Sequence, residues 1–259
     1  MGWLYKKRLY RILFLLWNGN LTGVLAIGHN ALEWFVSRGM EKNRVYPFAY
    51  FLAEPKIKSL SKLSNKKNKN KPYRFIYVGE LINLKKVDTL IKAIAALKVK
   101  KIELWIVGGG PEEKRLRLLA DLLIPKQVFW LGVISIKEVQ NIIYQADCLV
   151  LPSRYDGWGA VVSEALMVGT PVVCSNKCGS SVIVKASGVG SVFLANNQKS
   201  LNDSLYNQYK KGYVNSKERQ KIMKWAKRLT ARSGAKYLEL IFNIKNNKLD
   251  SSKIPWNKK

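Results

Sequence analysis

The strongest constraint on the fold is a regular alternation of short apolar runs and helix-like segments over residues 73–194. The apolar runs lie at residues 73–79, 102–107, 127–131, 147–152, 171–174 and 191–194. The run at residues 147–152 is continuous rather than alternating, as a strand buried on both faces of a sheet requires. Strands separated by helices form right-handed βαβ units. The sequence therefore predicts an α/β fold built on a doubly wound, Rossmann-like parallel sheet.

Local signals place helices between these strands. Apolar residues recur at helical spacing from Val87 to Leu97. Ser135 and Glu138 have the spacing of a capping box, which marks a helix start. Further helices are predicted over residues 159–168, 217–228 and 235–242. In the tail that follows, Pro255 and Trp256 could dock on the body of the domain.

The first 72 residues are less regular. A strand at residues 21–27 and a helix at residues 30–37 make at most a partial αβα remnant of a domain. The expected division of the chain is a remnant at 1–46, a linker at 47–72, a ligand-binding domain at 73–215, and C-terminal helices with a tail at 216–259.

Residues 153–164, SRYDGWGAVVSE, join a buried strand to a helix and carry the groups best suited to chemistry. Gly157 and Gly159 permit a sharp turn and leave no side chain in the way of a ligand. The helix begins with unpaired N–H groups and a positive dipole end, which suit a phosphate. Asp156 and Glu164 can each accept hydrogen bonds from sugar or ribose hydroxyls. From spacing alone, a glycine-rich turn with solvated acids is an equally good interpretation.

This segment resembles the E-x7-E region of retaining glycosyltransferases of family 4, with Asp156 in the first acidic position. Residues 164–173, EALMVGTPVV, resemble that family's EAMACGTPVV, and residues 78–94 resemble its VGRL and KGVD stretch. The resemblance is close over residues 73–185, and several motifs agree in order, which makes it more specific than a single motif. It implies the C-terminal, donor-binding domain of a GT-B fold.

The resemblance also implies a role for each matching residue. Lys85 and Asp156 are the catalytic candidates, and Lys85 would stabilise the charge that grows on the departing donor phosphate. The donor would be a nucleotide-diphosphate sugar, and neither a cofactor nor a metal ion is expected. The remaining donor-binding candidates are Glu80, Gly132, Val133, Gly157, Trp158, Gly159, Ala160, Val161 and Glu164. In this assignment Glu164 binds the ribose, and the loop at Gly132 lies near the base.

The sequence departs from the family pattern in three places. Glu80 stands where the family usually has an arginine, and a carboxylate cannot replace a cation against a diphosphate. Lys86 stands where the family usually has glycine. Most of the N-terminal acceptor domain is expected to be absent from this chain. His29 does not occupy the position of the family's histidine and is interpreted as a structural or surface residue.

The charge balance favours anionic partners. The chain has 45 basic and 17 acidic residues, for a net charge of +28. No nucleic-acid-binding motif accompanies this charge, so nucleic acid is not an expected partner. Basic residues from Lys6 to Arg11 beside Leu9, Leu13 and Trp17 suit a helix at an anionic membrane surface, or an ordinary amphipathic helix packed on the domain. The three cysteines form no disulfide framework, which indicates a reducing compartment and a cytoplasmic location, peripheral to the membrane if that helix binds it.

The leading hypothesis is a retaining glycosyltransferase of cell-surface polysaccharide or lipopolysaccharide biosynthesis, with a glycan or lipid-linked acceptor. The alternative is a truncated or split, non-catalytic module that binds a nucleotide sugar, with a separate polypeptide supplying the acceptor domain. A third hypothesis, a polyanion-binding protein, depends on net charge alone.

Overall fold

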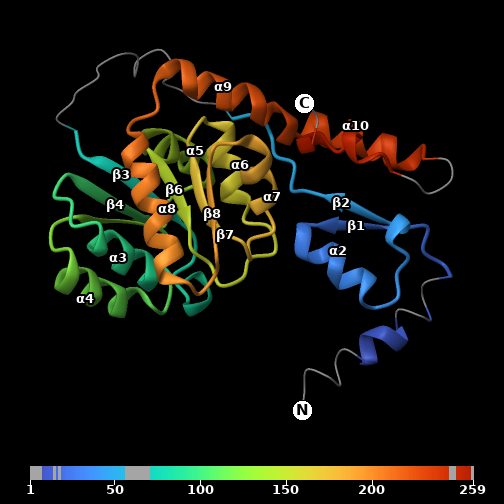
Figure 1. Ribbon diagram of the computed structural model, residues 1–259, viewed down its shortest axis with the longest axis horizontal. Helices are drawn as coiled ribbons and strands as arrows, with labels where there is room; N and C mark the ends of the chain where they lie inside the picture. The colour runs from blue at the N-terminus through green and yellow to red at the C-terminus, as the bar shows by residue number, and fades with distance from the viewer. Residues whose placement is uncertain (1–7, 14–15, 17–18, 56–70, 245–248, 258–259) are drawn as a thin grey trace.

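The computed structural model describes residues 8–13, 16, 19–55, 71–244 and 249–257, and it confirms the predicted α/β fold (Figure 1). Its core is a six-stranded parallel sheet with the order β5-β4-β3-β6-β7-β8. The strands are β3 (Tyr73–Val78), β4 (Ile102–Val107), β5 (Val128–Gly132), β6 (Cys148–Leu151), β7 (Val172–Ser175) and β8 (Gly190–Phe193). Each was expected from the apolar runs. The central strands β6 and β7 are buried at every residue, as their unbroken apolar sequences predict.

Helices cover both faces of the sheet (Figure 1). One face carries α3 (Val87–Ala96), α4 (Glu113–Leu123) and α8 (Gln198–Lys211). The other carries α5 (Ile136–Gln145), α6 (Ala160–Met167), α7 (Ser181–Ser187) and α9 (Ser216–Ala226). The predicted capping box is present, with Ser135 and Glu138 bonded reciprocally at the start of α5. Chain order reverses between β3 and β6, and in doubly wound folds ligands bind above that reversal.

The N-terminal part is a small unit of its own. It contains β1 (Val24–Ile27), α2 (His29–Val36) and β2 (Val45–Phe48), and the two strands pair in parallel. The sequence predicted β1 and α2 but not β2, because Pro47 and the short apolar stretch around it do not read as a strand. The partial αβα remnant therefore gains a strand, which crosses the expected boundary between residues 46 and 47. The division into four segments stays a prediction.

The C-terminal helix ties the N-terminal unit to the sheet domain (Figure 1). Helix α10 (Ala231–Phe242) places Tyr237 against Phe48, with ring centroids 6.0 Å apart and nearly parallel planes. The Tyr237 hydroxyl donates a hydrogen bond of 2.9 Å to the carbonyl of Pro47. Gly234 is needed at this crossing, because a Cβ there would lie 2.5 Å from the ring of Phe51. The predicted docking of Trp256 is also confirmed, since its side chain is buried.

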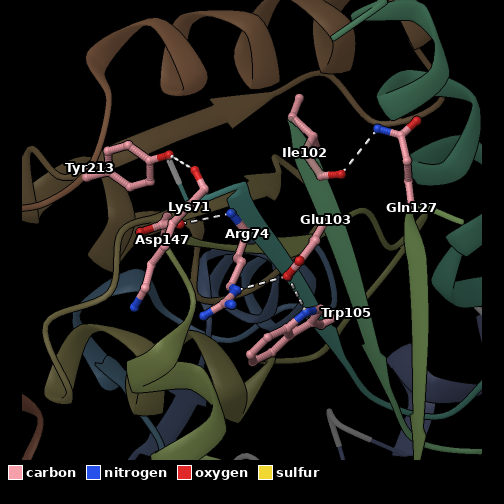
Figure 2. A network of polar contacts seen from close by, with 8 residues as sticks. All are labelled: Lys71, Arg74, Ile102, Glu103, Trp105, Gln127, Asp147 and Tyr213. Atoms are coloured by element: carbon pink, nitrogen blue, oxygen red, sulfur yellow. Dashed lines mark hydrogen bonds and ion pairs between the residues drawn. The ribbon is translucent and has the colours of Figure 1, made fainter. Parts of the chain in front are cut away.

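A polar network lies at the amino-terminal end of the sheet, opposite the carboxyl end at which ligands bind in doubly wound folds (Figure 2). The Arg74 amide donates to Asp147 at 2.8 Å, and the Arg74 guanidinium donates to Glu103 at 2.9 Å. The indole of Trp105 donates to the same Glu103 carboxylate at 3.0 Å. The Tyr213 hydroxyl donates to the carbonyl of Lys71 and so attaches the start of β3 to the segment after α8. These polar groups bond to one another and connect the starts of the strands, so their role here is structural.

The three cysteines are buried free thiols, as expected of structural residues. Burial raises the pKa of the Cys178 thiol to about 11, so it remains protonated at neutral pH. Within the described part of the chain, no helix combines the length and apolar content needed to cross a bilayer.

Candidate functional site

A cavity of about 330 Å³ lies at the carboxyl ends of β3 and β6, where the order of the sheet reverses. It is lined by Tyr50, Val78, Gly79, Lys85, Leu151, Asp156, Gly157, Trp158, Gly159, Ala160 and Val161. Seven of these eleven residues were candidates from the sequence. The position agrees with the general rule for open parallel sheets, in which ligands bind outside the carboxyl ends of the strands.

The cavity contains one ion pair. Lys85 ends the short 3-10 helix η2 (Asn83–Lys85) after β3, and Asp156 follows β6. Lys85 Nζ lies 2.7 Å from Asp156 Oδ2, and the two side chains are 21% and 14% exposed. Partial burial strengthens the attraction between the charges relative to a surface pair. The structure thus brings together the two residues that the sequence selected as catalytic candidates.

A tight turn leads from Asp156 into α6. Gly159 adopts a left-handed conformation with φ 77°, and a Cβ there would lie 2.6 Å from Leu151 Cδ2, so only glycine fits. No side chain caps α6, and Ala160 and Val161 line the cavity at its first turn. An uncapped helix start directs unpaired N–H groups and a positive dipole end toward the cavity, which favours an anion.

Trp158, a donor-binding candidate from the sequence, is a buried residue of this turn. Its indole is 1% exposed, and Nε1–H donates to Ser163 Oγ at 3.2 Å. The rings of Tyr50 and Trp256 lie 6.4 Å and 6.3 Å from it. The residue forms part of the cavity wall, but its polar atom is committed to α6. Its expected contribution to ligand binding is therefore the shape of the turn rather than a hydrogen bond.

Glu164 lies in the second turn of α6 and outside the lining of the cavity. Its carboxylate has no hydrogen-bond or ion-pair partner among the residues that the structure describes. Burial raises the pKa of this carboxyl above its usual value. A half-buried acid without a partner is costly to keep, which makes Glu164 a candidate for an interaction that only a ligand supplies.

Three other candidates also lie outside the cavity lining. Glu80 is exposed, and its backbone carbonyl accepts a hydrogen bond of 2.8 Å from the buried Tyr77 hydroxyl. Gly132 has φ 65° at the end of β5, and Val133 beside it is 83% exposed. A Cβ on Gly109 would lie 3.4 Å from Val133 Cγ2, so this loop borders the glycine-rich turn after β4. The ligand-binding roles of all three residues stay predictions.

Lys86 adopts the left-handed region with φ 55° and ψ 38°, immediately before α3. The family pattern has glycine here, and the observed backbone explains that preference, because only glycine enters this region without cost. The Lys86 ammonium lies 3.7 Å from Asp88 and outside the cavity lining. Of the two lysines that could face a diphosphate in place of the missing arginine, the structure places Lys85 and not Lys86 in the cavity lining.

The N-terminal unit reaches the same turn through backbone contacts. A Cβ on Gly28 would lie 2.7 Å from the carbonyl oxygen of Gly157, and one on Gly179 would lie 2.0 Å from that oxygen. His29 follows Gly28, and its Nδ1 lies 3.5 Å from the Gly179 carbonyl oxygen and 3.4 Å from Ser181 Oγ. This agrees with a structural role for His29. It also makes Gly28 part of the support for the site.

Sequence reasoning missed Tyr50, Val78 and Leu151 in the cavity wall, and it placed Gly79 only in a glycine-bearing loop at the carboxyl end of the sheet. Val78, Gly79 and Leu151 are strand-end residues, and the assigned topology already placed strand ends at a ligand site. Tyr50 comes from the segment after β2 and is 49% exposed. No pattern in the sequence connects Tyr50 with residues a hundred positions later, so its role was visible only in the structure.

The sequence matches the family described as glycosyl transferases group 1 over residues 61–229, which is more than half of the chain. The chain belongs to this family. The matched region contains every candidate residue of the site.

One relative of this group 1 glycosyl transferase is an uncharacterized 41.2 kDa protein in the cps region of Klebsiella pneumoniae. It is 22% identical over 175 residues, which are 66% of this chain and 48% of the relative. The chain thus spans about half the length of that protein. The fold is shared with the apo form of a lipopolysaccharide outer core galactosyltransferase, WaaB, at a TM-score of 0.73 and 21% identity, covering 85% of this chain and 62% of that one.

A second solved neighbour is Anabaena Alr3699/HepE in complex with UDP and glucose. The TM-score is 0.73 and the identity is 17%, and the match covers 92% of this chain and 68% of that one. At these identities the likeness concerns the fold, which is of the GT-B type.

Proposed function

We propose that this chain binds a nucleotide-diphosphate sugar and acts as a retaining, family 4 glycosyltransferase in the synthesis of a cell-surface polysaccharide or lipopolysaccharide. The observation that carries the proposal is the Lys85–Asp156 ion pair at the uncapped start of α6, inside a cavity above the sheet reversal. A cation and a helix start suit a diphosphate, and a carboxylate suits sugar hydroxyls. The structural neighbour Alr3699/HepE, which was solved with UDP and glucose bound, supports this ligand class.

In the proposed reaction the donor diphosphate lies against Lys85 and the first turn of α6. The bond between the anomeric carbon and the diphosphate oxygen breaks, and the acceptor hydroxyl oxygen bonds to that carbon on the same face. The acceptor proton passes to the leaving diphosphate. Lys85 stabilises the negative charge that grows on that group, which is where a fixed cation accelerates the reaction most. Neither a metal ion nor a cofactor has a step in this scheme.

The ion pair has a consequence for binding. In the free protein Lys85 and Asp156 satisfy each other at 2.7 Å. Donor binding would divide the pair, with phosphate oxygens facing Lys85 and sugar hydroxyls donating to Asp156. The charge of each residue is then compensated in both states. A nucleotide or a sugar alone would compensate only one of the two charges after breaking the pair, whereas the intact donor compensates both. The intact nucleotide sugar should therefore bind better than either part alone.

The test is an activity assay with UDP-glucose and related nucleotide sugars, analysed by NMR for release of the nucleoside diphosphate and for the anomeric configuration of the product. Sugar transfer or hydrolysis that keeps the α-configuration supports the proposal. A product with inverted configuration would overturn the retaining mechanism, and an activity that requires added Mg²⁺ would overturn the metal-free scheme.

The alternative is a non-catalytic module that binds a nucleotide sugar and works with a polypeptide that carries the acceptor half. The two-stranded β1–β2 sheet motivates it, because parallel strands are normally embedded in larger sheets covered on both faces. Glu80, which replaces an expected cation, also favours it. Assays of the chain with and without a co-expressed neighbouring polypeptide separate the two functions, since turnover by the chain alone excludes the module.

A peripheral location at the cytoplasmic face of a membrane is part of the proposal. Leu9, Ile12, Leu13 and Leu16 have the spacing of one helix face, and each is exposed by at least 39%. Arg8 and Arg11 lie beside them, whereas Lys6, Lys7 and Trp17 fall outside the described residues. Flotation with anionic vesicles tests the idea, with zwitterionic vesicles as the control. If the protein stays unbound to the same extent with anionic and with zwitterionic vesicles, the membrane location is rejected. Binding of nucleic acid at physiological salt would instead support the polyanion-binding hypothesis.

A further inference from the structure

The turn at the proposed donor site is held by one large side chain. Glycine stands on both sides of Trp158, so within residues 157–159 only this indole can anchor the backbone by packing. Among the residues that the structure describes, it is the largest fully buried side chain. Its Nε1–H bond to Ser163 connects the turn to the helix start that follows. The position of Trp158 therefore sets the position of the turn.

The neighbours of Trp158 come from remote parts of the chain. Trp256 belongs to the 3-10 helix η6 (Pro255–Asn257) in the C-terminal tail, and its ring lies 6.3 Å from Trp158 at an angle of 51°. Tyr50 contacts Trp158 from the segment after β2 at 6.4 Å but is 49% exposed. Trp256 is 6% exposed. Of these two aromatic neighbours, Trp256 is the one that is itself fixed by packing.

Several contacts hold Trp256 in place. Tyr237 of α10 meets it edge to face at 6.4 Å, and the Tyr237 hydroxyl is tied to the carbonyl of Pro47. Within the tail, the Asn257 amide donates to the carbonyl of Ile254 at 2.9 Å. The Asn257 side chain donates to the carbonyl of Ser251 at 3.1 Å. These contacts hold the Trp256 ring in place, and the Trp158 indole packs against it.

We propose that Trp256 is a positioning residue for the donor-sugar turn, and that the C-terminal tail thereby forms part of the site. The proposal rests on the function proposed above. Removing the Trp256 ring leaves a void beside Trp158, and the indole can tilt into it, because neighbouring side chains relax part of the way into such a void. The turn would move with the indole, whereas the buried residues Val162 and Ser163 hold the start of α6 in place. A displacement of about 1 Å near reacting groups can reduce a rate by about 100-fold.

The effect should depend on which part of the donor is bound. In the proposed binding mode the turn faces the sugar, whereas Lys85 and Glu164 hold the diphosphate and the ribose. A displaced turn therefore weakens binding of a nucleotide sugar more than binding of the nucleotide alone. A general loss of stability would weaken both equally, which distinguishes positioning from simple support of the fold.

The experiment is calorimetric titration of UDP-glucose and UDP into the wild type, Trp256→Ala and Trp256→Phe. If the wild type prefers another base, the corresponding GDP or ADP pair is used. Trp105→Ala is the matched control, because Trp105 is a half-buried tryptophan of β4 that lies outside the cavity lining and donates to Glu103 (Figure 2). We expect Trp256→Ala to weaken UDP-glucose binding about tenfold and UDP binding by less than about threefold, with Phe restoring most of the loss.

An unchanged ratio of the two affinities in Trp256→Ala, or an equal change of that ratio in Trp105→Ala, would overturn the positioning role. If Trp256→Ala does not fold, Trp256→Leu and Trp256→Phe replace it, and a graded loss of sugar selectivity from Phe to Leu is then required. A wild type that binds neither the nucleotide sugars nor the nucleotides contradicts the proposed function itself, so the two failures are distinguishable.

Discussion

Lys85 Nζ and Asp156 Oδ2 lie 2.7 Å apart across the reversal of the sheet between β3 and β6. The residues are far apart in sequence, and the parallel sheet brings them together because both follow strands that end at the same edge. Under the proposed function, this cation and carboxylate would receive the negative diphosphate and the hydroxyl-rich sugar of the donor.

Lys85→Ala removes the cation of this pair. We expect donor binding to weaken markedly and sugar transfer to fall by about 100-fold or more, since a fixed charge against the developing phosphate is worth that much in comparable sites. Lys86→Ala is the matched control, because the Lys86 side chain lies outside the cavity lining. Steady-state kinetics of both variants check the prediction, and equal losses would show that general surface charge is responsible.

Lys86→Gly should stabilise the protein. A residue with a Cβ at φ 55° pays for the left-handed conformation, and glycine removes that cost while losing more chain entropy on folding. The expected net gain is about 0.5–1 kcal/mol in the free energy of unfolding, measured by urea denaturation. A loss of stability would mean that the Lys86–Asp88 contact outweighs the backbone strain.

Gly28→Ala should disturb the site from the N-terminal unit. The new methyl would lie 2.7 Å from the Gly157 carbonyl oxygen, so either the turn or β1 must move. Gly188→Ala is the control, because Gly188 also has a positive φ but has open space around it. Both variants should lose stability, and only Gly28→Ala should also weaken UDP-glucose binding. Unchanged binding in Gly28→Ala would show that the N-terminal unit is not coupled to the turn.

Glu164→Gln should make stability less dependent on pH. Burial raises the pKa of Glu164 in the folded state above its unfolded value of about 4.3. Its ionisation therefore costs stability, a cost that is absent in acid and complete once the pH exceeds the folded pKa. The variant should melt at a higher temperature than the wild type at pH 7, and the difference should shrink as the pH falls toward 4. A constant difference would assign the effect to packing.

The sequence predicted the sheet well because strands such as β6 and β7 are buried on both faces. An unbroken apolar run such as residues 148–151 has few alternatives in a parallel α/β fold. Strand β2 escaped prediction because it is short, contains Pro47 and is stabilised by pairing with β1 rather than by its own pattern. The tertiary contacts of β2 with α10 are long-range and leave no local signal.

The residues of the site also fall into those that the sequence could predict and those that it could not. Glycines with required backbone angles and charged residues in ordered motifs, such as Gly159 and Lys85, were recognisable in the sequence. The burial of Trp158 was not, because the flanking glycines and Asp156 suggest an exposed turn. Its partner Trp256 is almost a hundred residues away, and only packing relates the two. The left-handed backbone of Lys86 was hidden by the lysine itself.

The central claim is that the cavity above β3 and β6 is a nucleotide-sugar donor site. Calorimetric titration with a panel of UDP-, GDP- and ADP-sugars, repeated on Lys85→Ala and Glu164→Ala, tests it most directly. The predicted result is saturable binding of at least one nucleotide sugar to one site, weakened at least about tenfold in each variant. Absence of binding to the wild type, or binding that neither substitution changes, would contradict the claim.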